Sequence, residues 1–180
     1  MRVVISFAVL LALATFVAAD PPQEGKPAPD IKLPATQIQK VLPDAKPDTR
    51  ELSLKDLKGK NVVLFFFPKA MTPGCTIESC GFRDKIEDLA KLDTVVIGIS
   101  VDTLEDQQKF TDKEKLNFPL FADSTKEITK TYGVLRPDAG VANRVTFIID
   151  KDGVIRKIYT KVTPMDHPAE VVQFIKDLRK

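Results

Sequence analysis

Two continuous apolar runs lie near the middle of this chain, NVVLFFF at 61–67 and TVVIGISV at 94–101. Their length and their content of β-branched and aromatic residues are typical of strands buried on both faces of a sheet. Between the two runs, Phe82, Ile86 and Leu89 recur at helical spacing. The pattern therefore predicts a strand–helix–strand unit with parallel strands and a right-handed crossover.

Proline and small polar residues indicate where the helices begin. Thr72 suits the N-cap of the first helix and Pro73 suits its first helical position, so we expect this helix to run from there to about Ala90. A second helix is predicted at about 103–115, followed by a short strand near 118–121. Strands and helices alternate up to this point, as they do around a parallel sheet.

The pattern changes in the last third of the chain. Ser124 and Glu127 have the spacing of a capping box, and Gly133 is placed to end the short helix that this box would begin. The runs at 145–150 and 154–159 then flank a Lys-Asp-Gly sequence, which indicates a hairpin of two antiparallel strands.

A final helix is predicted at about 167–179. Its expected buried residues are Val171, Phe174, Ile175 and Leu178. Parallel units followed by an antiparallel hairpin and a covering helix predict an α/β protein with a mixed central β-sheet flanked by helices. This element order is that of a thioredoxin-like fold.

The beginning of the chain differs in composition from the rest. Residues 1–19 combine a positively charged Arg2, an apolar run and a small-residue cleavage site, which is typical of a secretory signal peptide. The alternative, a membrane anchor, is disfavoured because the apolar run is shorter than the ~20 residues that a spanning helix needs. We therefore expect signal removal, export to the periplasm or the exterior, no stable membrane insertion afterwards, and one domain at 20–180.

The segment that follows the predicted signal, 20–50, is rich in proline and cannot form long regular structure. We expect extended pieces or a short hairpin at the edge of the domain there. A short helix is predicted at 53–57, where Gly59 stops it.

Charge and composition exclude several classes of function. The 27 basic and 25 acidic residues nearly cancel, so there is no electrostatic case for nucleic acid or an anionic membrane as a partner. His167 is the only histidine, which argues against a His-rich metal site and a Cys–His catalytic pair. No Gly-rich phosphate loop is present. We expect no cofactor and no metal.

The chain contains two cysteines, Cys75 and Cys80. With Thr72 at the N-cap, Cys75 lies in the first helical turn, where free backbone N–H groups and the helix dipole favour the nucleophilic thiolate. The helix follows a central strand, and sites in open α/β sheets form at the carboxyl ends of such strands. Cys75 is thus the candidate nucleophile.

The spacing of the two cysteines argues against a static disulfide. Five residues along an α-helix correspond to a rise of ~7.5 Å and a rotation of ~140°. A disulfide needs Cα atoms within ~7 Å, so bonding these two requires the helix to unwind. Gly81 lowers the stability of the helix beside Cys80 by about 1 kcal/mol relative to alanine. This arrangement favours a cysteine that is oxidised by peroxide to a sulfenic acid and then resolved by its neighbour.

The segment FFFPKAMTPGCTIESCGFRD closely resembles the active site of peroxiredoxins. It is most similar to the atypical two-cysteine branch called bacterioferritin comigratory protein or peroxiredoxin Q. The signature P-x-x-x-T-x-x-C is matched by Pro68, Thr72 and Cys75, and the resolving cysteine of that branch is matched by Cys80. The resemblance extends from about Gly25 to the C-terminus, although the segment at 35–49 is longer than the hairpin usual in the family.

The resemblance implies a role for each site residue. Cys75 is the peroxidatic cysteine, Cys80 resolves it, Thr72 offers its hydroxyl to the peroxide, and Pro68 shields the site from water. Arg144 supplies a guanidinium to the thiolate. The predicted hairpin agrees with that last role, since a strand antiparallel to 61–67 would begin beside Cys75.

The resemblance also implies the partners: a peroxide substrate, hydrogen peroxide or an organic hydroperoxide, and a thioredoxin-like or other dithiol reductant. We expect a monomer. Two alternatives stay open, an exported thiol–disulfide exchange protein, for which the usual C-x-x-C is missing, and a non-catalytic thioredoxin-fold module with a static disulfide.

Glu78 is either a partner of an arginine or an exposed helix residue, and Arg83 and Asp84 are expected to form a solvated pair.

Overall fold

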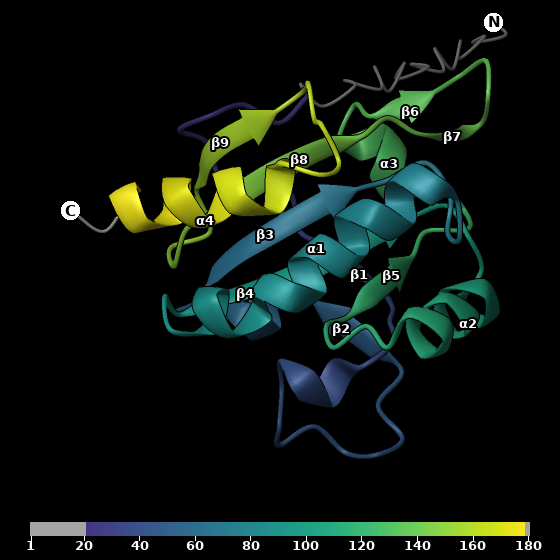
Figure 1. Cartoon of the computed structure of the whole chain (residues 1–180), viewed down its shortest axis with the longest axis horizontal. Helices are drawn as coiled ribbons and strands as arrows, with labels where there is room; N and C mark the ends of the chain where they lie inside the picture. Colours follow the sequence, from purple (N-terminus) through teal and green to yellow (C-terminus); the bar gives the residue numbers. More distant parts are fainter. Residues whose placement is uncertain (1–20, 179–180) are drawn as a thin grey trace, which may run out of the picture.

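The centre of the molecule is a mixed sheet of five strands (Figure 1). The computed structural model describes residues 21–178, so the predicted signal at 1–19 lies outside the described residues. The strand order is β5 (Leu120–Ala122), β4 (Thr94–Ser100), β3 (Asn61–Phe66), β8 (Val145–Ile149) and β9 (Ile155–Tyr159). β3, β4 and β5 are parallel, and β8 is antiparallel to both β3 and β9. The predicted fold class is confirmed.

Helices cover both faces of this sheet. On one face, α1 (Pro73–Ala90) and α4 (His167–Leu178) pack against buried residues of β3 and β4, as Figure 1 shows. α2 (Leu104–Glu114) lies beside the edge strand β5, and the short α3 (Glu127–Thr131) covers the opposite face. The alternating core residues of β3 therefore serve two apolar clusters, one on each side of the sheet.

The N-terminal part forms the short hairpin that its prolines predict. β1 (Lys32–Pro34) pairs antiparallel with β2 (Glu51–Ser53), and the 3₁₀ helix η2 (Leu54–Leu57) follows directly. The long connection at 35–49 contains a second 3₁₀ helix, η1 (Ile38–Lys40), whose Ile38 side chain is buried in the core. The connection is thus part of the packed domain.

Two further short strands, β6 (Leu135–Arg136) and β7 (Val141–Ala142), form a small ladder of their own before β8. Within 21–178, no helix is both long enough and apolar enough to cross a membrane.

The predicted capping box of α3 is wrong. The N-cap is Lys126, with a left-handed φ of 65°, and the buried carboxylate of Asp123 accepts hydrogen bonds from the Thr129 amide at 2.7 Å and from its hydroxyl at 2.6 Å. Asp123 directly follows β5, so the end of the strand places its carboxylate at the start of α3. Ser124 is not the N-cap, and the carboxylate that accepts the Thr129 amide belongs to Asp123.

The expected buried face of α4 is only partly correct. Val171 and Ile175 are fully buried and Phe174 is partly buried against the same cluster, but the side chain of Leu178 is 40% exposed. Leu178 is the last residue of α4, and it lines a hollow at the surface together with Asn61 and Lys151.

Candidate active site

Cys75 is the third residue of α1 and its side chain is buried, with 1% exposed. α1 begins as the sequence predicts, with Thr72 at the N-cap and Pro73 at the first helical position. The Thr72 hydroxyl does not cap a helix amide; it donates to the carbonyl of Lys69 at 2.9 Å. The loop 68–72 connects β3 to the first turn of α1, which carries Cys75, and the Thr72 hydrogen bond lies within this loop.

Arg144 reaches Cys75 from the other side. It immediately precedes β8, and because Val145 pairs with Phe66 at the end of β3, Arg144 lies beside the loop that follows that strand. Its Nη2 is 3.3 Å from the Sγ of Cys75. The expected proximity of these two side chains, which are far apart in the sequence, is confirmed.

Glu78 completes this cluster one helical turn after Cys75. Its side chain is fully buried and accepts a charge-assisted hydrogen bond from Nη1 of Arg144. Burial raises the pKa of Glu78 to about 7, although Arg144 acts in the opposite direction. Among the described residues its Oε1 has no hydrogen-bond partner. Of the two alternatives left by the sequence, Glu78 is the partner of an arginine.

Cys80 lies farther along α1, in a different environment. Both cysteines are free, and Cys80 is partly buried, with its Sγ 3.8 Å from Oε2 of Glu114 on α2. Burial raises the pKa of the Cys80 thiol, and nearby Glu114 acts in the same direction, against Arg83. An unbroken helix separates the two sulfurs, so the structure is that of a reduced protein.

Arg83 and His167, which lie near the site, make contacts that the sequence did not predict. Arg83 forms the predicted pair with Asp84, but it also donates to the carbonyl of Glu114 at 2.7 Å and so ties α1 to α2. His167 begins α4 as predicted and is fully buried, with Nε2 2.8 Å from Oγ1 of Thr146.

Asp102 was not anticipated from the sequence. It lies just beyond β4, and its Oδ2 accepts a hydrogen bond of 2.8 Å from the backbone amide of Ala70 in the loop before α1. No motif marks this aspartate, because the contact joins the ends of two strands that only the sheet brings together.

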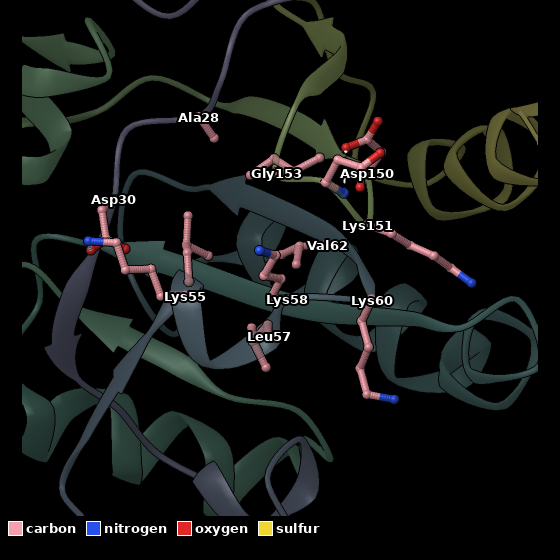
Figure 2. Close-up of a pocket in the computed structure, with 13 residues that line it drawn as sticks. Ala28, Asp30, Lys55, Leu57, Lys58, Lys60, Val62, Asp150, Lys151 and Gly153 are labelled. Carbon is pink, nitrogen blue, oxygen red and sulfur yellow. Dashed lines mark hydrogen bonds and ion pairs between the residues drawn. The ribbon is translucent and has the colours of Figure 1, made fainter.

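A separate hollow of about 250 Å³ lies at the opposite end of β3. It is lined by residues of η2, the first residues of β3 and the β8–β9 turn, and neither cysteine is among them. Lys55 forms an ion pair with Asp30 there, and Figure 2 shows the ammonium groups of Lys60 and Lys151 directed away from the hollow. The reactive groups are therefore gathered around Cys75 and not here.

Comparisons with known proteins identify the family of this chain. Residues 25–158 match the model of the AhpC/TSA family. The chain is 40% identical over 160 residues to peroxiredoxin Bcp of Bacillus subtilis, covering 86% of this chain and 95% of that protein. It is 35% identical over 142 residues to peroxiredoxin Bcp of Escherichia coli, covering 76% and 90% of the two chains.

Solved structures of other proteins resemble the fold of this chain. The peroxidoxin BcpB of Mycobacterium tuberculosis superposes with a TM-score of 0.76 at 29% identity, over 88% of this chain and 99% of that one. A cysteine-to-serine mutant of PrxQ from Xylella fastidiosa superposes with a TM-score of 0.77 at 22% identity, over 90% and 100% of the two chains, and supports the fold alone.

Proposed function

The chain belongs to the AhpC/TSA family and is a thiol peroxidase, and we propose that Cys75 is its peroxidatic cysteine and Cys80 its resolving cysteine. The observation that carries the proposal is the approach of the Arg144 guanidinium to within 3.3 Å of the Cys75 sulfur at the start of α1. A guanidinium stays charged and has several donors in a fixed plane, so it can serve a thiolate and a peroxide oxygen together.

In the first step the Cys75 thiolate attacks one oxygen of the peroxide and the O–O bond breaks. Cys75 becomes a sulfenic acid, and the departing hydroxide or alkoxide takes up a proton and leaves as water or an alcohol. Arg144 and the first amides of α1 would stabilise the charge that moves onto the leaving oxygen. We assign to Thr72 the hydrogen bond to the peroxide and to Pro68 the exclusion of water from the sulfur.

In the second step the Cys80 sulfur attacks the sulfenic sulfur, a disulfide forms, and water leaves. Support comes from the free state of both thiols and from the helical stretch between them, which is followed by Gly81. Cα atoms five residues apart in a helix are beyond the ~7 Å limit for a disulfide, so this step requires α1 to unwind.

The third step returns the enzyme to its starting state. Peroxiredoxins use thioredoxin-type reductants, and we propose that a dithiol of that class reduces the Cys75–Cys80 disulfide. Two electrons pass from the dithiol to the two cysteines, and the reductant leaves as a disulfide. The protein is proposed to act as a monomer.

The place of action is a further part of the proposal. The composition of residues 1–19 supports export with removal of that segment, after which an exported reductant would be required. N-terminal sequencing of the protein from cell fractions tests this. A chain that keeps its first residues in the cytoplasmic fraction would contradict export and leave the peroxidase assignment standing.

The central test is peroxide turnover with dithiothreitol as the electron donor. Cys75→Ser should abolish turnover, because a serine hydroxyl has almost no anionic form near neutral pH. Cys80→Ser is the matched control, since it removes a sulfur but leaves the nucleophile, and it should still consume peroxide. Turnover that survives in Cys75→Ser would exclude Cys75 as the nucleophile.

A further inference from the structure

The loop that precedes Cys75 has an anchor outside the cysteine motif. β3 and β4 are parallel neighbours, with Phe66 opposite Ile99, so the residues that follow the two strands lie side by side. One of these is Asp102, whose Oδ2 accepts the backbone N–H of Ala70 at 2.8 Å. Ala70 is buried, and it lies midway between Pro68 and Thr72.

The Asp102 carboxylate is itself held by a buried chain of donors. The Ser100 hydroxyl donates to Oδ2 of Asp102 at 2.6 Å, and the Gln107 side-chain amide donates to the Ser100 hydroxyl at 2.8 Å and to the Phe121 carbonyl at 2.9 Å. Ser100 and Gln107 are fully buried. The anchor therefore connects the loop to the sheet and to α2, and the carboxylate has little freedom to move.

The anchored loop contains a strained residue. Met71 has a φ of 62°, a left-handed conformation that residues other than glycine rarely adopt, and its side chain is 41% exposed, so packing does not hold it. The hydrogen bond from the Ala70 amide to Asp102 fixes the residue directly before it. Without that bond, the strain at Met71 favours a different course of the loop up to Thr72.

We propose that Asp102 is a positioning residue for the peroxide reaction, which acts by holding the Ala70 amide so that Pro68 and Thr72 stay in place beside Cys75. The inference rests on the roles proposed above for Pro68 and Thr72. It separates two halves of the site, because Arg144 reaches Cys75 from the start of β8 with Glu78 of α1 as its partner, whereas the Asp102 anchor reaches the loop from the end of β4.

The test measures two reactions of Cys75 in the same variants. In Asp102→Ala, the second-order rate constant with hydrogen peroxide, followed by rapid quenching and intact mass, should fall by about tenfold or more, since small misplacements of positioning groups have effects of this size. The alkylation rate of Cys75 with iodoacetamide, measured in a Cys80→Ser background, should change little, because that reaction needs the thiolate but not the loop.

Three further variants separate position from charge and from stability. Asp102→Asn keeps an oxygen acceptor in place and should retain most of the peroxide rate constant, whereas Asp102→Glu keeps the charge but displaces the carboxylate and should react slowly. Thr103→Ala removes the N-cap hydrogen bond to the Asp106 amide of α2 without touching Ala70, so it should lower the thermal midpoint and leave the peroxide rate constant intact.

Two results would overturn the inference. One is a peroxide rate constant in Asp102→Ala equal to that of the parent. The other is equal slowing in Thr103→Ala at the same loss of thermal midpoint, which would make the effect one of general stability. Both would leave Cys75 as the nucleophile, whereas turnover in Cys75→Ser would remove the proposed function itself.

Discussion

At the scale of single residues, the ion pair between buried Glu78 and partly buried Arg144 lies next to the Cys75 sulfur. One guanidinium contacts both the sulfur and the carboxylate, so the protonation of Glu78 changes the charge next to the nucleophile. Burial makes the charged carboxylate unfavourable, which is why the pKa of Glu78 rises to about 7 from the ordinary value of 4.5.

This shift predicts a pH dependence of stability. Because the folded-state pKa of Glu78 is the higher one, the unfolded chain releases its proton first, and this residue lowers the free energy of unfolding as the pH rises from about 4.5 to about 7. Glu78→Gln cannot ionise, so its free energy of unfolding relative to the parent should increase over that range by about 3 kcal/mol. Urea unfolding at several pH values measures the difference.

The exposed Glu87 on the same helix provides the control for that experiment. Glu87→Gln makes the same chemical change at a position that solvent reaches. A Glu78→Gln difference that stays constant between about pH 4 and about pH 8 would show that Glu78 is not desolvated as its position indicates.

At the scale of elements, the proposed Cys75–Cys80 disulfide requires the first part of α1 to unwind, whereas the part from Phe82 onward is held by packing. Phe82 is fully buried, its ring centroid 4.8 Å from that of Phe65 and 5.7 Å from that of His167. Gly81 is in close contact with α4, since a Cβ there would lie 2.7 Å from Cγ of Pro168. These contacts predict that unwinding stops before Phe82.

We therefore expect one equivalent of peroxide to give an intramolecular Cys75–Cys80 disulfide with loss of amide protection over 74–81 and retained protection over 82–90. Hydrogen exchange in both redox states, with intact mass, measures this. In Cys80→Ser, one peroxide per chain should still be consumed, the helix should stay protected, and Cys75 should over-oxidise to the sulfinic acid. Full protection over 74–81 after oxidation, or a disulfide between two chains, would contradict local resolution.

At the scale of the whole molecule, the sheet holds the site through tightly packed contacts between layers. Gly98 lies in the middle of β4, where a Cβ would be 2.7 Å from Cδ2 of Leu120 and 2.8 Å from Cζ of Phe65. Phe65 in turn packs on Phe82 of α1. There is no space for a side chain at position 98, so any larger residue would have to displace Leu120 and Phe65 in the core.

Gly98→Ala should accordingly lower the free energy of unfolding by about 1–3 kcal/mol through overpacking. The peroxide rate constant of the folded variant should stay close to that of the parent, because the crowding at this position falls on Leu120 and Phe65 and not on the groups around Cys75. Chemical unfolding and rapid-quench kinetics measure the two effects. Val95→Ala, at a partly buried position of the same strand, is the control, and an equal loss there would mean that Gly98 has no special restriction.

Local patterns in the sequence predicted the five strands of the central sheet, the main helices and the candidate nucleophile, but not the short strands β6 and β7. Apolar runs at 61–67 and 94–101, the Thr72–Pro73 helix start and the hairpin near 151–153 depend on local periodicity and backbone preference, which neighbouring residues specify. The position of Cys75 in a first helical turn follows from the same local signals. These structural predictions are confirmed with boundaries that differ by a few residues.

Which distant groups meet depends on how the elements pack. The sequence anticipated Arg144 beside Cys75 through the expected hairpin and the family resemblance, but it left the environment of Glu78 open and did not indicate Asp102. The register of β8 against β3 places Arg144 beside Cys75. Glu78 is buried on α1, where it pairs with that arginine. The parallel pairing of β3 and β4 brings Asp102 to the loop before α1. The start of α3 was mispredicted for the same reason, since the Thr129 amide there donates to the carboxylate of Asp123, which follows β5. Contacts of this kind depend on how elements pack, and no local pattern of residues encodes them.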